Sequence, residues 1–76
     1  MSLSDNLKLF RKQTKLTRIE VAKNLNISDS TVGHYETGYT KPKIDDLKVM
    51  ARLYNKTVAE LIGNENDRVD LPLASI

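Results

Sequence analysis

The chain has 76 residues, of which 39% are hydrophobic. This length allows one small domain with a modest core and excludes a second domain with a buried active site. Because it contains no cysteine and a single histidine, it cannot build a disulfide framework, a thiolate zinc site or a histidine metal cluster. Its formal net charge is only +2, and it has neither the run of about 20 apolar residues that a membrane span needs nor a signal-peptide core, so we expect a soluble cytoplasmic protein.

The first expected helix occupies the N-terminal part of the chain. Ser4 or Asp5 can cap its start, and it should end at about Gln13. Leu7 and Phe10 then lie on its inward face, three residues apart.

The segment Thr17 to Gly38, TRIEVAKNLNISDSTVGHYETG, predicts two short helices joined by a tight turn. The Thr17 hydroxyl can cap the first of them while Glu20 closes a capping box. Asn26 tolerates the left-handed conformation that follows a helix end. Ser28 can cap the second helix, whose buried stripe is Val32 and Tyr35.

The remaining helices follow a polar loop over residues 39–43. Gly38 is expected to end the preceding helix in a left-handed conformation. Helical spacing then places five residues on one core face, namely Ile44, Leu47, Met50, Ala51 and Tyr54. Thr57 and Glu60 repeat the capping-box pattern, so a fifth helix should run to about Ile62 and end at Gly63. Residues 1–63 are therefore expected to form one domain.

Residues 64–76 form a C-terminal tail of different character. NENDR is polar, and Val69, Leu71 and Leu73 then alternate with other residues. Pro72 lacks an amide donor, which argues against a central strand but allows an edge strand or a segment packed along a partner. The pattern allows an extended arm, and a disordered terminus is the alternative.

At the motifs described above, the chain resembles the Xre family of helix-turn-helix regulators, which includes the phage Cro proteins and phage repressors. The likeness extends from about Leu7 to Ile62. It includes T-x-x-E-V-A, S-x-S-T-V, Y-E-x-G and L-x-x-x-A, followed by T-V-A-E-L-I. The resemblance implies an all-α fold, a compact bundle of five helices, that is usually paired as a homodimer and whose third helix reads double-stranded DNA.

The resemblance also implies which residues contact the bases. The matching positions are Asp29, Ser30 and His34, with Ser28 and Gly33 at the edge of the same face. A glycine inside a helix costs about 1 kcal/mol relative to alanine and needs a reason, which close approach of DNA would provide. The alternatives are that Asp29 favours the helix N-terminus, that Ser30 is solvated and that His34 is simply exposed.

Phosphate contacts are implied at both ends of the helix-turn-helix. The positions are Thr17, Arg18, Thr37, Tyr39, Thr40, Lys41 and Lys43, and an ordinary solvated loop is the alternative for the last four. The family usually has Gln where Arg18 stands, and that Gln often braces a base-reading residue. An interaction between Arg18 and Asp29 could substitute for it. Lys56 also departs from the family, and its stem is expected to lie over the core with its ammonium in water.

Two further roles follow from the resemblance. Arg11 and Glu36 match a salt bridge that ties the first helix to the end of the third. The dimer contact of the family points to Val58, Leu61 and Ile62, together with Val69 and Leu71 of the tail. Alternatively, these apolar residues only close the core of the monomer.

We therefore expect a sequence-specific transcriptional regulator, in which the family habit suggests a repressor acting as a dimer on a two-fold operator. Residues 1–43 hold eight Lys/Arg against four Asp/Glu, whereas residues 44–76 hold four against six. A basic half suits phosphates, although a solvated mixed surface explains the asymmetry equally well. The alternative function is a protein-interaction module, an antitoxin or phage antirepressor with an unknown protein partner. An enzyme is not expected, because the sequence has no nucleophile–base pair, metal cluster or phosphate loop, and no cofactor is implied.

Overall fold

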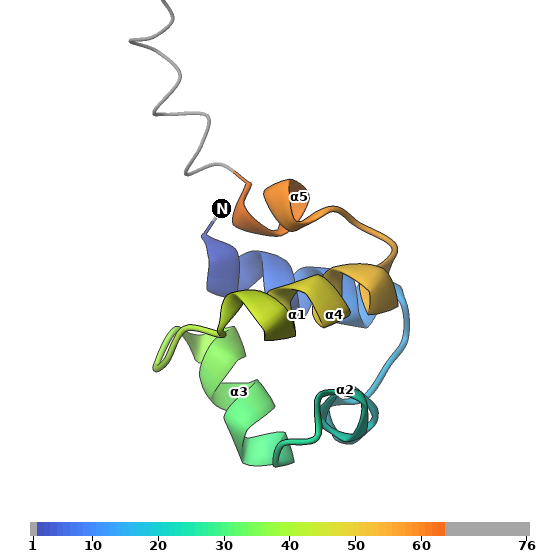
Figure 1. Cartoon of the computed structure of the whole chain (residues 1–76), viewed down its shortest axis with the longest axis vertical. Coiled ribbons are helices and arrows are strands. Elements are labelled where there is room, and N and C mark those ends of the chain that lie inside the picture. Colours follow the sequence, from blue (N-terminus) through green and yellow to red (C-terminus); the bar gives the residue numbers. More distant parts are fainter. Residues whose placement is uncertain (1, 64–76) are drawn as a thin grey trace, which may run out of the picture.

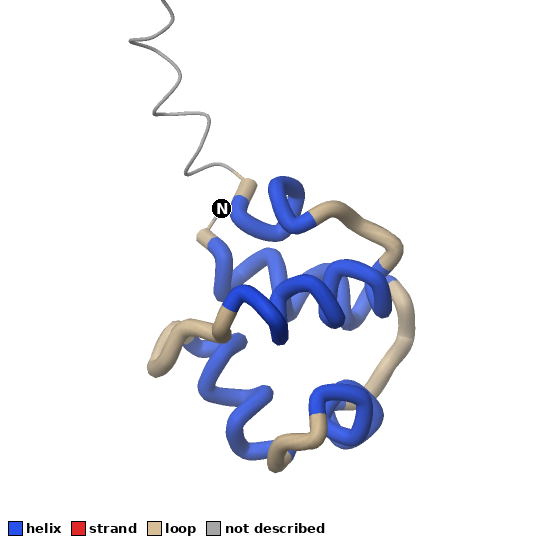
Figure 2. The backbone as a smooth tube through the Cα atoms, in the orientation of Figure 1, coloured by secondary structure: helices blue, strands red, loops and turns tan. Residues whose placement is uncertain are grey.

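The computed structural model describes residues 2–63, which form five α-helices and contain no strand. The helices are α1 (Leu3–Gln13), α2 (Arg18–Leu25), α3 (Asp29–Thr37), α4 (Ile44–Tyr54) and α5 (Val58–Ile62). In Figure 1, α1 and α4 cross the middle of the molecule, α2 and α3 lie on one side of them and α5 lies on the other. The tube in Figure 2 shows the loops that connect the helices. The expected all-α bundle is confirmed.

Local hydrogen bonds fix most helix ends where the sequence predicted them. Thr17 and Glu20 form a complete capping box at α2, and Thr57 and Glu60 form a second one at α5. Asn26 ends α2 with φ 61° and ψ 43°, and Gly38 ends α3 with φ 84°. These caps satisfy backbone groups that a helix end leaves without partners.

The start of α1 differs from the prediction. Ser2 is the N-cap, and its hydroxyl accepts a hydrogen bond from the amide of Asp5 at 3.2 Å. The earlier start brings Leu3 into the helix, where it packs against the core. The prediction of a cap at Ser4 or Asp5 was therefore wrong, since packing of Leu3 favours the earlier of the available caps.

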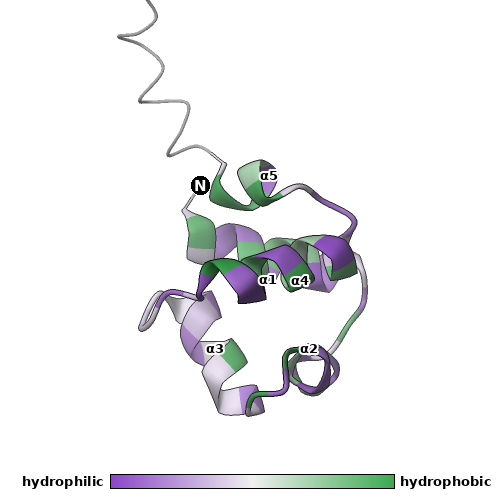
Figure 3. Cartoon of the chain, in the orientation of Figure 1, coloured by the Kyte–Doolittle hydropathy of each residue, from purple (hydrophilic) through white to green (hydrophobic). Residues whose placement is uncertain are grey.

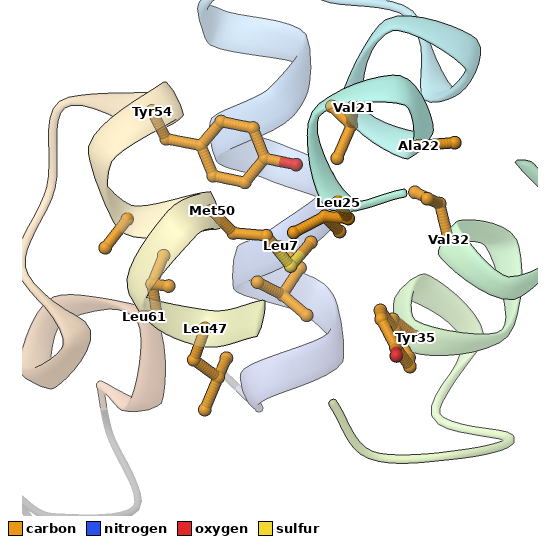
Figure 4. Packing of buried hydrophobic residues seen from close by; sticks show 11 residues of the cluster. Leu7, Val21, Ala22, Leu25, Val32, Tyr35, Leu47, Met50, Tyr54 and Leu61 are labelled. Atoms are coloured by element: carbon orange, nitrogen blue, oxygen red, sulfur yellow. The ribbon is translucent and has the colours of Figure 1, made fainter. Parts of the chain in front are cut away.

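The core lies between the five helices and is formed by residues from all of them (Figure 4). Its largest fully buried side chains are Tyr54, Leu7, Met50, Leu61, Val21 and Val32. The predicted stripe of α4 is confirmed at Leu47, Met50, Ala51 and Tyr54. It is wrong at Ile44, which is 55% exposed because it stands at the first position of α4, where the chain enters from the surface loop.

Two contacts close the bundle at its ends. The side-chain amide of Asn6 donates to the carbonyl of Leu61 at 2.9 Å, although 55 positions separate the two residues in sequence. Gly63 follows with φ 61°, and a Cβ there would lie 2.5 Å from Asn6 Nδ2. At the opposite end of α1, the Lys56 ammonium lies 4.9 Å from the centre of the Phe10 ring, so this departure from the family makes a cation–π contact.

No helix within residues 2–63 combines the length and the apolar character needed to cross a membrane.

Candidate nucleic-acid interface

A three-residue turn sets the angle between α2 and α3. Asn26 donates to the carbonyls of Ala22 and Lys23, and the amide of Ile27 also donates to Ala22 at 3.1 Å. Ile27 packs against the core, and Ser28 then caps α3 by accepting from the amide of Thr31 at 3.2 Å. The turn is thus held at both ends, so the two helices keep a fixed relation.

The two sides of α3 differ in burial and polarity. Val32, Tyr35 and Glu36 are buried against the rest of the bundle. The predicted base-reading residues Asp29, Ser30 and His34 are exposed. Figure 3 shows α3 mostly pale or purple, with one strongly hydrophobic stretch, as expected for a helix that turns a polar side outward. The polar side is therefore accessible within the described part of the chain.

Ser28 and Gly33, the two residues predicted at the edge of this face, make contacts within the chain that the sequence did not predict. The Ser28 hydroxyl, besides capping α3, lies 2.8 Å from the hydroxyl of Thr31. Gly33 is buried, because the side chain of Arg18 covers it. The side chain of Arg18 therefore lies beside Gly33, and close approach of DNA at this glycine stays a prediction.

Arg18 lies against α3 but does not pair with Asp29. Its Nη1 atom is 2.8 Å from the position that a Cβ on Gly33 would occupy. No hydrogen bond or ion pair joins Arg18 to Asp29 in residues 2–63, so the proposed substitute for the family's Gln is not formed. Arg18, which stands where the family usually has Gln, lies against Gly33 instead.

The predicted phosphate-contacting residues lie at the start of α2, at the end of α3 and in the loop after it. All of them are exposed, namely Thr17, Arg18, Thr37, Tyr39, Thr40, Lys41 and Lys43. The Thr17 hydroxyl already accepts from the amide of Glu20 at 3.1 Å. Buried Pro42 anchors the loop that carries the two lysines. Tyr39 is 77% exposed, and its ring lies 4.8 Å from that of His34, centre to centre, at an angle of 48°. This contact joins a predicted base-reading residue to the loop predicted to contact phosphates.

Sequence reasoning missed two cations on α1. Lys8 and Lys12 are exposed and line one cavity of about 250 Å³. The other residues that line it are Arg11, Arg18, Gly33, Glu36 and Thr37. The spacing of Lys8 and Lys12, one helical turn apart, was the signal that could have placed them together. They extend the basic surface from the start of α2 onto α1.

The predicted ion pair between α1 and α3 is present and nearly buried. Arg11 Nε lies 2.6 Å from Glu36 Oε2, and Arg11 Nη2 lies 3.1 Å from Oε1. The third guanidinium nitrogen donates to the carbonyl of Leu16 at 2.9 Å. The two side chains are 12% and 3% exposed. The hydrogen bond to Glu36 raises the pKa of Arg11 above its ordinary value, so the guanidinium remains charged.

Tyr54 lies close to this ion pair. Burial raises the pKa of its phenol, and the negative charge of Glu36 raises it further. Its hydroxyl is buried and has no hydrogen-bond partner among the residues described. The phenol of Tyr54 is therefore neutral beside the charged guanidinium of Arg11.

The predicted dimer contacts fall into three groups. Leu61 is 0% exposed, so its side chain is already used inside its own chain and the expectation that it contacts a second copy is corrected. Val58 and Ile62 are partly exposed, and their helix α5 lies on the side of α1 and α4 away from α2 and α3 (Figure 1). Val69 and Leu71 lie outside the described residues, as does the whole predicted arm.

Groups of three or more His, Cys, Asp or Glu side chains that could hold a metal ion do not occur in the described part of the chain. The polar atoms of the interface are hydroxyls, a carboxylate, an imidazole and cations. Such a set forms hydrogen bonds and ion pairs with a large polar partner.

Comparison with known proteins shows what this chain is similar to. Residues 7–61 match the Helix-turn-helix family, a range that includes all of α2, α3 and α4. The chain is 38% identical over 61 residues to the uncharacterized HTH-type transcriptional regulator YobD of Bacillus subtilis, with 80% of this chain and 54% of that protein aligned. It is 35% identical over 65 residues to the HTH-type transcriptional regulator ImmR of the same organism, with 86% and 51% aligned.

A third relative comes from a phage. The cryptic phage CTXphi transcriptional repressor RstR of Vibrio cholerae is 28% identical over 72 residues, with 95% of this chain and 65% of that protein aligned. The chain thus spans about half the length of YobD and ImmR. Since the family match covers most of the chain, including both helices of the motif and the turn between them, the chain belongs to the Xre-type helix-turn-helix family.

Proposed function

We propose that this chain is a DNA-binding transcriptional regulator that reads double-stranded DNA with the outward side of α3. The observation that carries the proposal is the exposure of Asp29, Ser30 and His34 on one side of a helix whose other side is buried. An α-helix presented in this way fits the major groove. The names of the aligned relatives, which are transcriptional regulators, support the same function.

The chemistry of the three side chains defines what they can read. The Asp29 carboxylate can accept from cytosine N4, and the Ser30 hydroxyl can donate or accept. The His34 imidazole can donate to guanine N7 or O6, or to a phosphate. None of them forms the two-pronged contact that Arg makes with guanine. We therefore expect modest base discrimination from direct contacts.

The cations around α3 are proposed to position the duplex. Arg18 at the start of α2 and Lys41 and Lys43 in the loop after α3 flank the helix and are exposed. Each phosphate contact releases counterions, so it contributes affinity for any sequence. Lys8 and Lys12 add positive charge beside Arg18.

Two copies of the domain are proposed to act together. A two-fold pair with its α3 helices about 34 Å apart would read two successive major grooves on one face of the duplex. Of the residues expected at the dimer contact, Val58 and Ile62 are the two that are described and partly exposed. Occupation of an operator would obstruct polymerase, and the name of RstR, a transcriptional repressor, supports a repressing role.

Selection of bound duplexes from a random pool, followed by titration at several salt concentrations, tests the proposal. We expect micromolar or tighter binding that falls steeply with salt, and two chains per selected duplex by light scattering. Lys41→Ala should weaken binding to all duplexes alike and reduce the salt slope by about 1. Lys48→Ala, which removes an exposed lysine of α4, is the matched control and should leave the slope unchanged.

Two results would contradict the proposal. Absence of any salt-dependent binding to DNA would reject the regulator. Salt-insensitive capture of a protein partner through the same residues would favour the protein-interaction alternative.

A further inference from the structure

Gly33 occupies a position where the backbone does not require a glycine. It lies in the interior of the nine-residue helix α3, and its φ is not among the positive values found in the described residues. Alanine forms helices better than glycine at such a position. The reason for glycine must therefore lie in the space beside it.

Arg18 fills that space. A Cβ on Gly33 would lie 2.8 Å from Nη1 of Arg18 and 3.9 Å from both Cδ and Cζ. Real Cβ atoms do not come as close as the first of these distances, so the guanidinium has to move if a side chain is added at position 33. The start of α2 itself is fixed, because the capping box of Thr17 and Glu20 holds it.

The covered glycine forms part of a basic cavity. Lys8, Lys12, Arg11 and Arg18 line it together with Glu36, its one carboxylate. Both oxygens of Glu36 are bonded to Arg11, at 2.6 and 3.1 Å. Lys8, Lys12 and Arg18 therefore have no carboxylate of their own within the cavity. Their uncompensated positive charge suits a phosphate oxygen.

We propose that Gly33 is a positioning residue for Arg18: by lacking a side chain, it lets Arg18 lie across α3 with its guanidinium in this cavity, where it binds a backbone phosphate of DNA. The inference rests on the proposed function. It differs from close approach of the duplex to Gly33 itself, because here the glycine acts through Arg18.

A double-mutant cycle separates the two explanations. Gly33→Ala, Arg18→Ala and the double variant are titrated with the selected duplex over a range of salt concentrations. We expect each single variant to lose roughly tenfold in affinity, as for a lost charge-assisted contact, and to reduce the salt slope by about 1. The double variant should bind no worse than Arg18→Ala, because Gly33 has no further effect once Arg18 is absent.

Two controls accompany the cycle. Gly33→Ala should melt at the same temperature as the wild type or higher, since only the end of a flexible side chain has to move. Arg52→Ala removes an exposed arginine at the end of α4 and should change neither affinity nor salt slope.

Three outcomes would overturn the inference. Full affinity of Gly33→Ala would show that the position of Arg18 does not matter. A further loss on adding Gly33→Ala to Arg18→Ala would show that DNA approaches Gly33 directly. A wild-type chain that binds no DNA would reject the proposed function as well, whereas the first two outcomes leave that function intact.

Discussion

The inward and outward sides of α3 differ in what holds their residues in place. On the inward side, Val32, Tyr35 and Glu36 are at most 7% exposed, and each contacts other parts of the bundle. On the outward side, Asp29 and Ser30 make none of the side-chain hydrogen bonds found within residues 2–63, and His34 touches only the ring of Tyr39 among aromatic neighbours. Folding therefore constrains the inward side of α3, whereas the outward side is free for the recognition role proposed above.

The inward side is fixed by polar contacts as well as by apolar packing. The Tyr35 hydroxyl donates to Asp46 Oδ2 at 2.9 Å and so ties α3 to α4. Glu36 ties α3 to α1 through Arg11. Loss of either contact should reduce the stability of the whole bundle and affect DNA binding only as a consequence.

The largest effect is expected at Glu36. Glu36→Gln leaves the Arg11 guanidinium buried without its counter-charge, which costs about 3–5 kcal/mol for a pair removed from water in this way. Urea unfolding followed by circular dichroism measures the change. Asp45→Asn, at an exposed acid of α4, is the control and should change stability by less than about 0.5 kcal/mol. An unchanged unfolding midpoint for Glu36→Gln would show that the ion pair has no structural role.

A smaller and opposite pattern is expected on the outward side at His34. His34→Ala should leave the free energy of unfolding within about 0.5 kcal/mol of the wild type. It should cost about 1–3 kcal/mol in binding to the selected duplex, the range for one lost base contact. Competition between the selected duplex and a scrambled one measures this. An equal loss of affinity for both duplexes would assign His34 to a phosphate contact. A loss of stability in His34→Ala would contradict the distinction between the inward and outward sides of α3.

The smallest effect concerns the capping boxes, which belong to neither side of α3. The backbone amides of Thr17 and Thr57 hold the pKa values of Glu20 and Glu60 below the ordinary 4.5. A lowered pKa means stability that is present above pH 4.5 and is lost as the pH falls through the lowered value. The double variant Glu20→Gln/Glu60→Gln lacks both carboxylates, so it lacks this pH-dependent contribution to stability at every pH.

Thermal melts between about pH 7 and pH 2 test this expectation. The melting temperature of the double variant should lie below that of the wild type near neutral pH, and the difference should disappear in acid. A difference that grows as the pH falls would contradict the direction of both pKa shifts. DNA affinity near neutral pH should change less than for His34→Ala.

Sequence reasoning succeeded where structure depends on neighbours along the chain. The caps at Thr17, Ser28 and Thr57 and the turn at Asn26 are set by hydrogen bonds that span three or four residues, so their residue types were sufficient evidence. The Arg11–Glu36 pair spans 25 positions and was found only through the family resemblance. The α1 start was missed because Ser2, Ser4 and Asp5 all suit a cap, and only the packing of Leu3 decides among them.

The errors at the interface have a common physical cause. The contact on Gly33 depends on the conformation of the Arg18 side chain, which comes from α2. The spacing of residues along α3 does not reveal it. Lys8 and Lys12 reach the same cavity only because α1 packs against α3. Leu61 has the residue type of a dimer contact, but the short helix α5 turns it inward. In each case the decisive neighbour is distant in sequence.

The contact between Asn6 and Leu61 bears on how this domain unfolds. It joins the first turn of the first helix to the last turn of the fifth, and Gly63 closes over the same amide. Opening of α1 at Asn6 or of α5 at Leu61 therefore breaks a bond to the other helix. We expect the smallest fragment that folds cooperatively to include both residues, and a chain shortened past either of them to be cleaved more readily by proteases, including at the helix-turn-helix.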